Sequence, residues 1–145
     1  MTEATHQRIT SVLAALHLRE RWRDFYIGGC GPAAIALNEE ILAGKGSYVV
    51  STNLEDGSVP LPWSGHVAVY FDGVLFDYYE TWTWLEFGRC MNYKHPIILV
   101  DAEPELIREH FLIHWEERLE EARELVRSVV EQLKTCSYPY GNAEV

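Results

Sequence analysis

A predicted β-hairpin is the feature that most constrains how this chain can fold. Two runs rich in β-branched and aromatic residues, 66–71 and 74–79, are joined by Asp72 and Gly73. This dipeptide is strongly preferred in two-residue hairpin turns. Such a turn fixes the register of the two strands, so the segment predicts an antiparallel strand pair and, with it, a sheet.

The same register brings a histidine and a carboxylate together. Ala68 lies opposite Asp77 in this pairing. His66 lies opposite Tyr79, and because side chains alternate in direction along a strand, these four residues share one face of the sheet. His66 and Asp77 are then diagonal neighbours, with backbones roughly 7 to 8 Å apart, a gap that their side chains can bridge. The hairpin therefore predicts an imidazole oriented by a carboxylate.

A cysteine lies at the expected start of a buried helix. The segment 28–32 reads Gly-Gly-Cys-Gly-Pro, and Pro32 suits an early helical position, where its missing N–H costs nothing. We expect a helix from about Cys30 to Leu42 that is apolar on nearly all sides and therefore buried. The N–H groups and dipole of a first helical turn stabilise a thiolate, the nucleophilic form of cysteine. The alternative is a buried thiol that merely fits a tight helix entry.

Two further helices are predicted at the ends of the chain. An amphipathic pattern runs from Ala4 to about Phe25, and a single long helix is expected over 103–134, with Pro104 near its start. Apolar residues recur at steps of three and four along the long helix: Trp115, Leu119, Ala122, Val126, Val129 and Leu133. This seam fits a helix packed on its own domain, or one whose distal half pairs with a second copy in a homodimer.

The intervening segments complete one α+β domain over residues 1–145. Residues 48–50 fit a short strand, and the polar, proline-containing stretch 51–64 is interpreted as a surface loop. The aromatic stretch 81–87 fits either a short helix or an extended segment. The apolar run 96–100 is expected to be a central strand.

Composition excludes several classes of function. A net charge of −10 and a pI near 5.0 argue against nucleic-acid binding, which depends on clustered Lys and Arg. No apolar run approaches the roughly 20 residues that span a bilayer, and the N-terminus lacks a signal-peptide pattern, so we expect a cytoplasmic protein without membrane contact.

Cysteine and histidine spacing gives no metal or disulfide signature. Cys30, Cys90 and Cys136 form an odd set without C-x-x-C spacing, and the last two are interpreted as small buried residues. His110 and His114 have the i, i+4 spacing of a zinc pair, but the sequence supplies no evident third ligand. No metal site and no cofactor are expected.

The cysteine, histidine and aspartate segments resemble the papain-like superfamily of cysteine hydrolases. Residues 30–34, Cys-Gly-Pro-Ala-Ala, are similar to the helix start of bacterial double-glycine leader peptidases. Residues 65–69, Gly-His-Val-Ala-Val, followed by Phe76 and Asp77, are similar to their histidine and aspartate strands. The resemblance covers about residues 27–77 and implies a papain-like fold, with the nucleophile helix packed on a small antiparallel sheet.

The resemblance also implies a catalytic triad in which Cys30 is the nucleophile, His66 the base and Asp77 the orienting group. Many papain-like enzymes carry a glutamine about six residues before the nucleophile to complete the oxyanion hole, whereas this chain has Asp24 there. Tyr26 or Asn38 is the candidate replacement. Aromatic residues that follow the triad are candidates to wall a cleft for a peptide or acyl chain: Tyr78, Tyr79, Trp82 and Trp84.

These observations favour a thiol hydrolase or acyltransferase that acts on a peptide, amide or thioester carbonyl. Its expected partner is a peptide or protein substrate. One alternative is a catalytically inactive papain-like module that holds a protein partner through its acidic long helix and aromatic groove. Another is an assembly protein that dimerises through the helix over 103–134.

Overall fold

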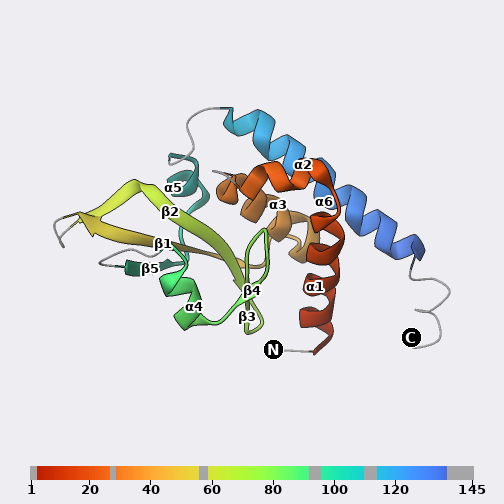
Figure 1. Ribbon diagram of the computed structural model, residues 1–145, viewed down its shortest axis with the longest axis horizontal. Coiled ribbons are helices and arrows are strands. Elements are labelled where there is room, and N and C mark those ends of the chain that lie inside the picture. The colour runs from red at the N-terminus through yellow and green to blue at the C-terminus, as the bar shows by residue number, and fades with distance from the viewer. Residues whose placement is uncertain (1–2, 27–28, 56–58, 92–95, 110–113, 137–145) are drawn as a thin grey trace.

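The computed structural model describes residues 3–26, 29–55, 59–91, 96–109 and 114–136 and shows an α+β fold (Figure 1). Its five-stranded sheet is antiparallel, with strand order β4-β3-β2-β1-β5. The strands are β1 (Ser47–Glu55), β2 (Val59–Phe71), β3 (Val74–Phe76), β4 (Thr81–Trp82) and β5 (Pro96–Val100). The helices are α1 (Glu3–His17), α2 (Glu20–Arg23), α3 (Cys30–Leu42), α4 (Trp84–Arg89), α5 (Pro104–Glu109) and α6 (Trp115–Cys136), with a 3-10 turn at Asp24–Tyr26.

The predicted hairpin is confirmed. β2 and β3 pair with Phe71 opposite Val74, and the next pairs follow in the same register. Asp72 and Gly73 form the turn, with φ of 51° and 82°, the two left-handed residues of a type I′ turn. The ladder ends at Phe76, so the second strand is shorter than the predicted run 74–79.

The segment 51–64 is not the predicted surface loop. β1 and β2 extend through most of it as a long antiparallel hairpin, which projects beyond the other strands in Figure 1. Two prolines misled the prediction, because proline has no N–H to donate to a strand ladder and is rare inside sheets. Pro60 lies opposite Leu54 of β1, and Pro62 lies where the β1–β2 register shifts. β3 reaches neither proline, because it pairs only with residues 69–71.

The run 96–100 is a strand, as predicted, but it lies at an edge rather than in the centre. β5 pairs with β1 and terminates the strand order, and its last residue, Val100, is 60% exposed. The long strand β2 occupies the centre instead. An apolar run without charges does not by itself distinguish these two positions.

Both predicted terminal helices are interrupted. The N-terminal helix ends at His17 and continues as the short α2 and a 3-10 turn. The long helix over 103–134 is divided into α5 and α6, and His114 has a φ of 58°, which an α-helix does not contain. The prediction was wrong because α5 and α6 both pack on the same core. Their apolar residues therefore follow one helical spacing across the break, and the sequence pattern does not reveal it.

The helix predicted from Cys30 to Leu42 is confirmed as α3, and it is buried as expected. It packs on one face of the sheet, α6 covers it from outside, and α1 packs in turn on α6. The seam of α6 is mostly buried within this chain, at Trp115, Leu119, Ala122, Val126 and Val129. It therefore packs on its own domain, while association with a second copy stays a prediction.

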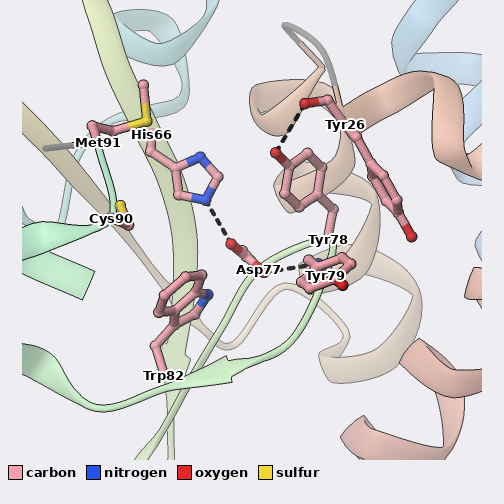
Figure 2. A pocket seen from close by; sticks show the side chains of 8 residues that line it. All are labelled: Tyr26, His66, Asp77, Tyr78, Tyr79, Trp82, Cys90 and Met91. Atoms are coloured by element: carbon pink, nitrogen blue, oxygen red, sulfur yellow. Dashed lines mark hydrogen bonds and ion pairs between the residues drawn. The ribbon is translucent and has the colours of Figure 1, made fainter. Parts of the chain in front are cut away.

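The opposite face of the sheet has a much smaller core. It is made by Val49, Ala68, Leu75 and Phe87, the last of which comes from α4. The ambiguous stretch 81–87 contains both predicted alternatives, because β4 ends at Trp82 and Thr83 caps α4. His66 and Asp77 belong to this second face, where their side chains point toward one another (Figure 2) and the ring of Phe87 lies beside His66.

Candidate active site

His66 and Asp77 meet as the hairpin register predicts. The Nε2 of His66 lies 2.5 Å from the Oδ2 of Asp77 (Figure 2). His66 is 7% exposed and Asp77 is fully buried. A buried carboxylate is costly unless it is paired and hydrogen-bonded. The contact gives the buried carboxylate of Asp77 a partner and gives the buried ring of His66 a hydrogen-bond acceptor.

The turn after β3 holds the carboxylate in place. The Oδ1 of Asp77 accepts the backbone N–H of Tyr79 at 2.7 Å and of Glu80 at 2.9 Å. The N–H of Asp77 donates to the carbonyl oxygen of Glu80 at 3.0 Å. Both carboxylate oxygens therefore have partners, and Oδ2 is left directed at His66.

The pairing with Asp77 also defines the state of the imidazole. A carboxylate only accepts hydrogen bonds, so Nε2 carries a proton and Nδ1 is the ring nitrogen left for another partner. The rings of Tyr78 and Phe87 flank His66, with centroids at 5.4 and 5.8 Å. Burial alone lowers the pKa of His66, but interactions with the side chains of Asp77 and Cys30 outweigh it and raise the pKa to about 9.

Cys30 is the first residue of α3 and lies beside this pair. Its Sγ is 3.9 Å from the carbonyl oxygen of Gly65, the residue before His66, and the cysteine is 7% exposed. In the first turn of α3, Cys30 and Gly31 carry N–H groups without an intrahelical partner, whereas Pro32 has none. The structure thus brings the three predicted triad residues into one region.

The turn before Cys30 depends on close packing. A Cβ on Gly29 would lie 2.7 Å from the Cα of Phe25 and would also meet the guanidinium of Arg118. Arg118, from α6, lies over the Phe25 ring at 4.5 Å and donates to the carbonyl oxygen of Asp24 at 3.3 Å. Gly29 is therefore required for close approach, and α6 helps to position the start of α3.

A cavity of about 240 Å³ adjoins the His66–Asp77 pair (Figure 2). Three residues predicted to bind substrate line it, namely Tyr26, Tyr79 and Trp82, and so does Tyr78. Trp84 does not, since it packs on Tyr70 instead. The aromatic stretch after the triad therefore supplies much of the wall.

Two wall residues were missed by the sequence interpretation. Cys90 and Met91 follow α4 and enter the same cavity. Burial, together with the charges of Asp77 and Cys30, raises the pKa of the Cys90 thiol to about 11, so Cys90 is a neutral thiol. Only the placement of α4 over the sheet reveals this role, because the residues lie far from the triad motifs in sequence.

Asn38 is not an oxyanion donor. Its Nδ2 donates to the carbonyl oxygen of Gly46 at 3.2 Å, and its Oδ1 accepts the N–H of Gly46 at 2.8 Å. Both ends of the amide are thus engaged in joining the end of α3 to β1. Tyr26 lines the cavity, but in Figure 2 its hydroxyl points away from His66, a placement that suits a wall residue better than an oxyanion donor.

Within the described ranges, no three His, Cys, Asp or Glu side chains cluster closely enough to hold a metal ion. His110 lies outside those ranges, so the predicted pair with His114 is only half described. No helix in the described part of the chain is long and apolar enough to cross a bilayer.

Comparison of the chain with protein-family models, with curated proteins and with solved structures gave no match in any of the three. The case for a function therefore depends on the site itself.

Proposed function

We propose that this protein is a cysteine hydrolase or acyltransferase that forms a covalent acyl intermediate on Cys30. The observation that carries the proposal is the buried His66–Asp77 contact of 2.5 Å beside a cysteine at a helix N-terminus. The contact orders the ring and leaves Nδ1 for the thiol. This is the relation of nucleophile, base and orienting group that covalent catalysis needs.

In the proposed first step, the Cys30 thiolate attacks the carbonyl carbon of the substrate. With a pKa of about 9, His66 is an imidazolium at neutral pH, which suits an ion pair with a thiolate. A carbon–sulfur bond forms, and the electron pair of the carbonyl bond moves to its oxygen. The N–H of Cys30 itself, at the start of α3, is the nearest candidate to stabilise that oxygen.

In the second step, the tetrahedral intermediate collapses as His66 Nδ1 gives its proton to the leaving group. The bond to that group breaks, and a thioester remains on Cys30. Water in a hydrolase, or an amine or thiol acceptor in a transferase, then attacks the thioester while His66 Nδ1 takes up the proton. The carbon–sulfur bond breaks, which releases the acyl product and restores the Cys30 thiolate. Asp77 keeps Nε2 as the donor and favours the imidazolium throughout.

The direct test is site-selective labelling followed by mass spectrometry. We expect iodoacetamide to modify Cys30 faster than Cys90 near pH 7, because the thiol of Cys90 stays neutral. A panel of p-nitrophenyl esters and thioesters should acylate Cys30 in the unaltered chain. Neither label should appear there in Cys30→Ala, while Cys90→Ala should keep both.

An inactive module that binds a protein partner is the second candidate, and one observation favours it. Cys30 is largely buried and is not part of the cavity wall that His66 and Asp77 line. If Cys30 reacts no faster than Cys90, or if no acyl probe labels it, catalysis is excluded and this second candidate is preferred.

A further inference from the structure

The cavity beside His66 has an aromatic wall with little free charge. Tyr26, Tyr78 and Tyr79 contribute rings from two segments, and Met91 adds a thioether. The ring of Tyr26 lies 5.3 Å from that of Tyr78 at 67° and 5.4 Å from that of Tyr79 at 88°. Such edge-to-face arrangements are the ones in which aromatic rings attract one another, so a further ring can extend the cluster.

The charged groups in the wall are already paired with each other. Asp77 directs one oxygen to His66 and the other to two backbone N–H groups. Its negative charge still acts on the cavity, because it adds to burial in raising the pKa of Tyr26, Tyr78 and Cys90. An anionic ligand would lose hydration here without gaining a cationic partner.

The size of the cavity agrees with one ring rather than with a small aliphatic group. Its volume is about 240 Å³. An apolar cavity of roughly 150 Å³ is enough to bind benzene. A benzyl or phenol side chain therefore fits with space for its connecting carbon, whereas a methyl group would leave most of the wall without contact.

The cavity also lies within reach of the nucleophile. His66 belongs both to the wall and to the pair that faces Cys30. The Sγ of Cys30 lies 3.9 Å from the carbonyl oxygen of Gly65, the residue before His66. A group bound in the cavity is thus positioned close to the atom that Cys30 attacks.

We infer that the cavity is a specificity pocket that binds an uncharged aromatic side chain of the substrate, next to the reacting carbonyl. This inference depends on the proposed function and names its substrate class. Aliphatic and acidic side chains at the same position are the disfavoured ones.

Binding without reaction gives the first test. Cys30→Ala, which removes only the thiol, would be titrated with N-acetyl-phenylalaninamide, N-acetyl-alaninamide and N-acetyl-glutamylamide while the indole N–H signals are followed by NMR. Trp82→Phe assigns the signal of Trp82. We expect the phenylalanine compound to shift that signal and to bind at least tenfold more tightly than the other two. Equal shifts, or none, would overturn the inference.

A wall variant gives the second test, with the unaltered nucleophile. Tyr79 is 48% exposed, and its contact with Asp77 is made by its backbone N–H, so Tyr79→Ala removes the ring and keeps that bond. We expect it to reduce the preference for a phenylalanine over an alanine p-nitrophenyl ester by about tenfold. Leu85→Ala is the matched control, since Leu85 is exposed and outside the wall.

Iodoacetamide separates the two possible failures, because it alkylates Cys30 without using the pocket. If Cys30 is alkylated selectively and all esters acylate it equally, the pocket assignment is wrong and the proposed chemistry stands. If Cys30 is neither alkylated selectively nor acylated, the proposed function is wrong, and the inference fails with it.

Discussion

The two faces of the sheet differ in what they bury. The face under α3 is a large aliphatic and aromatic core, whereas the face under α4 has four buried apolar residues and encloses His66 and Asp77. Polar groups are tolerated on the second face because they satisfy each other. The comparison teaches that the first face supplies most of the apolar core, whereas the second holds the His66–Asp77 pair, which Cys30 approaches from the start of α3. Substitutions can test how far these two parts are separable.

The largest expected effect is on the second face. Asp77→Asn retains one oxygen that can accept the N–H groups of Tyr79 and Glu80, but it removes the charge that holds His66 in the productive tautomer. In triads of this kind, that change lowers kcat by about 10,000-fold. The acylation rate of Cys30 by an ester probe would measure it. A loss below tenfold would show that Asp77 does not orient the base.

A substitution on the first face should lower the stability of the fold and leave the acylation rate unchanged. Leu37 is fully buried in α3, so Leu37→Ala should lower the free energy of unfolding by about 2–5 kcal/mol. Urea denaturation measures this loss. The acylation rate per folded molecule should stay unchanged, and a parallel fall in that rate would mean that the two faces are not separable.

The ionisation of His66 on the second face should make the stability of the whole fold depend on pH. Its pKa is raised from 6.5 to about 9 in the folded chain, so its contribution to stability is complete below pH 6.5 and is lost as the pH rises through 9. The urea midpoint should therefore fall between pH 6.5 and 9.5. In His66→Gln, which cannot titrate, this part of the pH dependence should disappear; an unchanged profile would exclude His66 as its source.

The smallest effect is expected at the outer layer of the first face. Arg123 of α6 pairs with Glu39 of α3 at 2.7 Å, in a partly exposed setting. Exposed ion pairs of this kind contribute roughly 0.2–1 kcal/mol, so Arg123→Met should cost less than about 1 kcal/mol, and the difference should shrink in high salt. A loss comparable to that of Leu37→Ala would mean that this pair belongs to the core.

The sequence predicted the contact between His66 and Asp77 better than it predicted the fold around them, and the reason is local geometry. Asp72 and Gly73 determine the hairpin register, which in turn places His66 beside Asp77, so this contact follows from neighbouring residues alone. The limits of α3 were predictable for the same reason, since Pro32 and the glycines mark its start.

The errors arose where long-range packing decides. Whether residues 51–64 form strands depends on pairing between β1 and β2, and the edge position of β5 depends on strand order. Asn38 looked like a free donor near Cys30, but Gly46 engages both ends of its amide. Cys90 enters the site only because α4 folds back over the sheet.

The contact of Arg118 with Phe25 and Asp24 has a consequence for the order in which the protein matures. Cys30, the proposed nucleophile, comes long before α6 in the sequence, yet the turn that precedes it is completed by a residue of α6. A ribosome-bound chain whose α6 has not yet emerged would lack that support. The thiol of Cys30 would therefore reach its final setting only after α6 has emerged and packed against the turn.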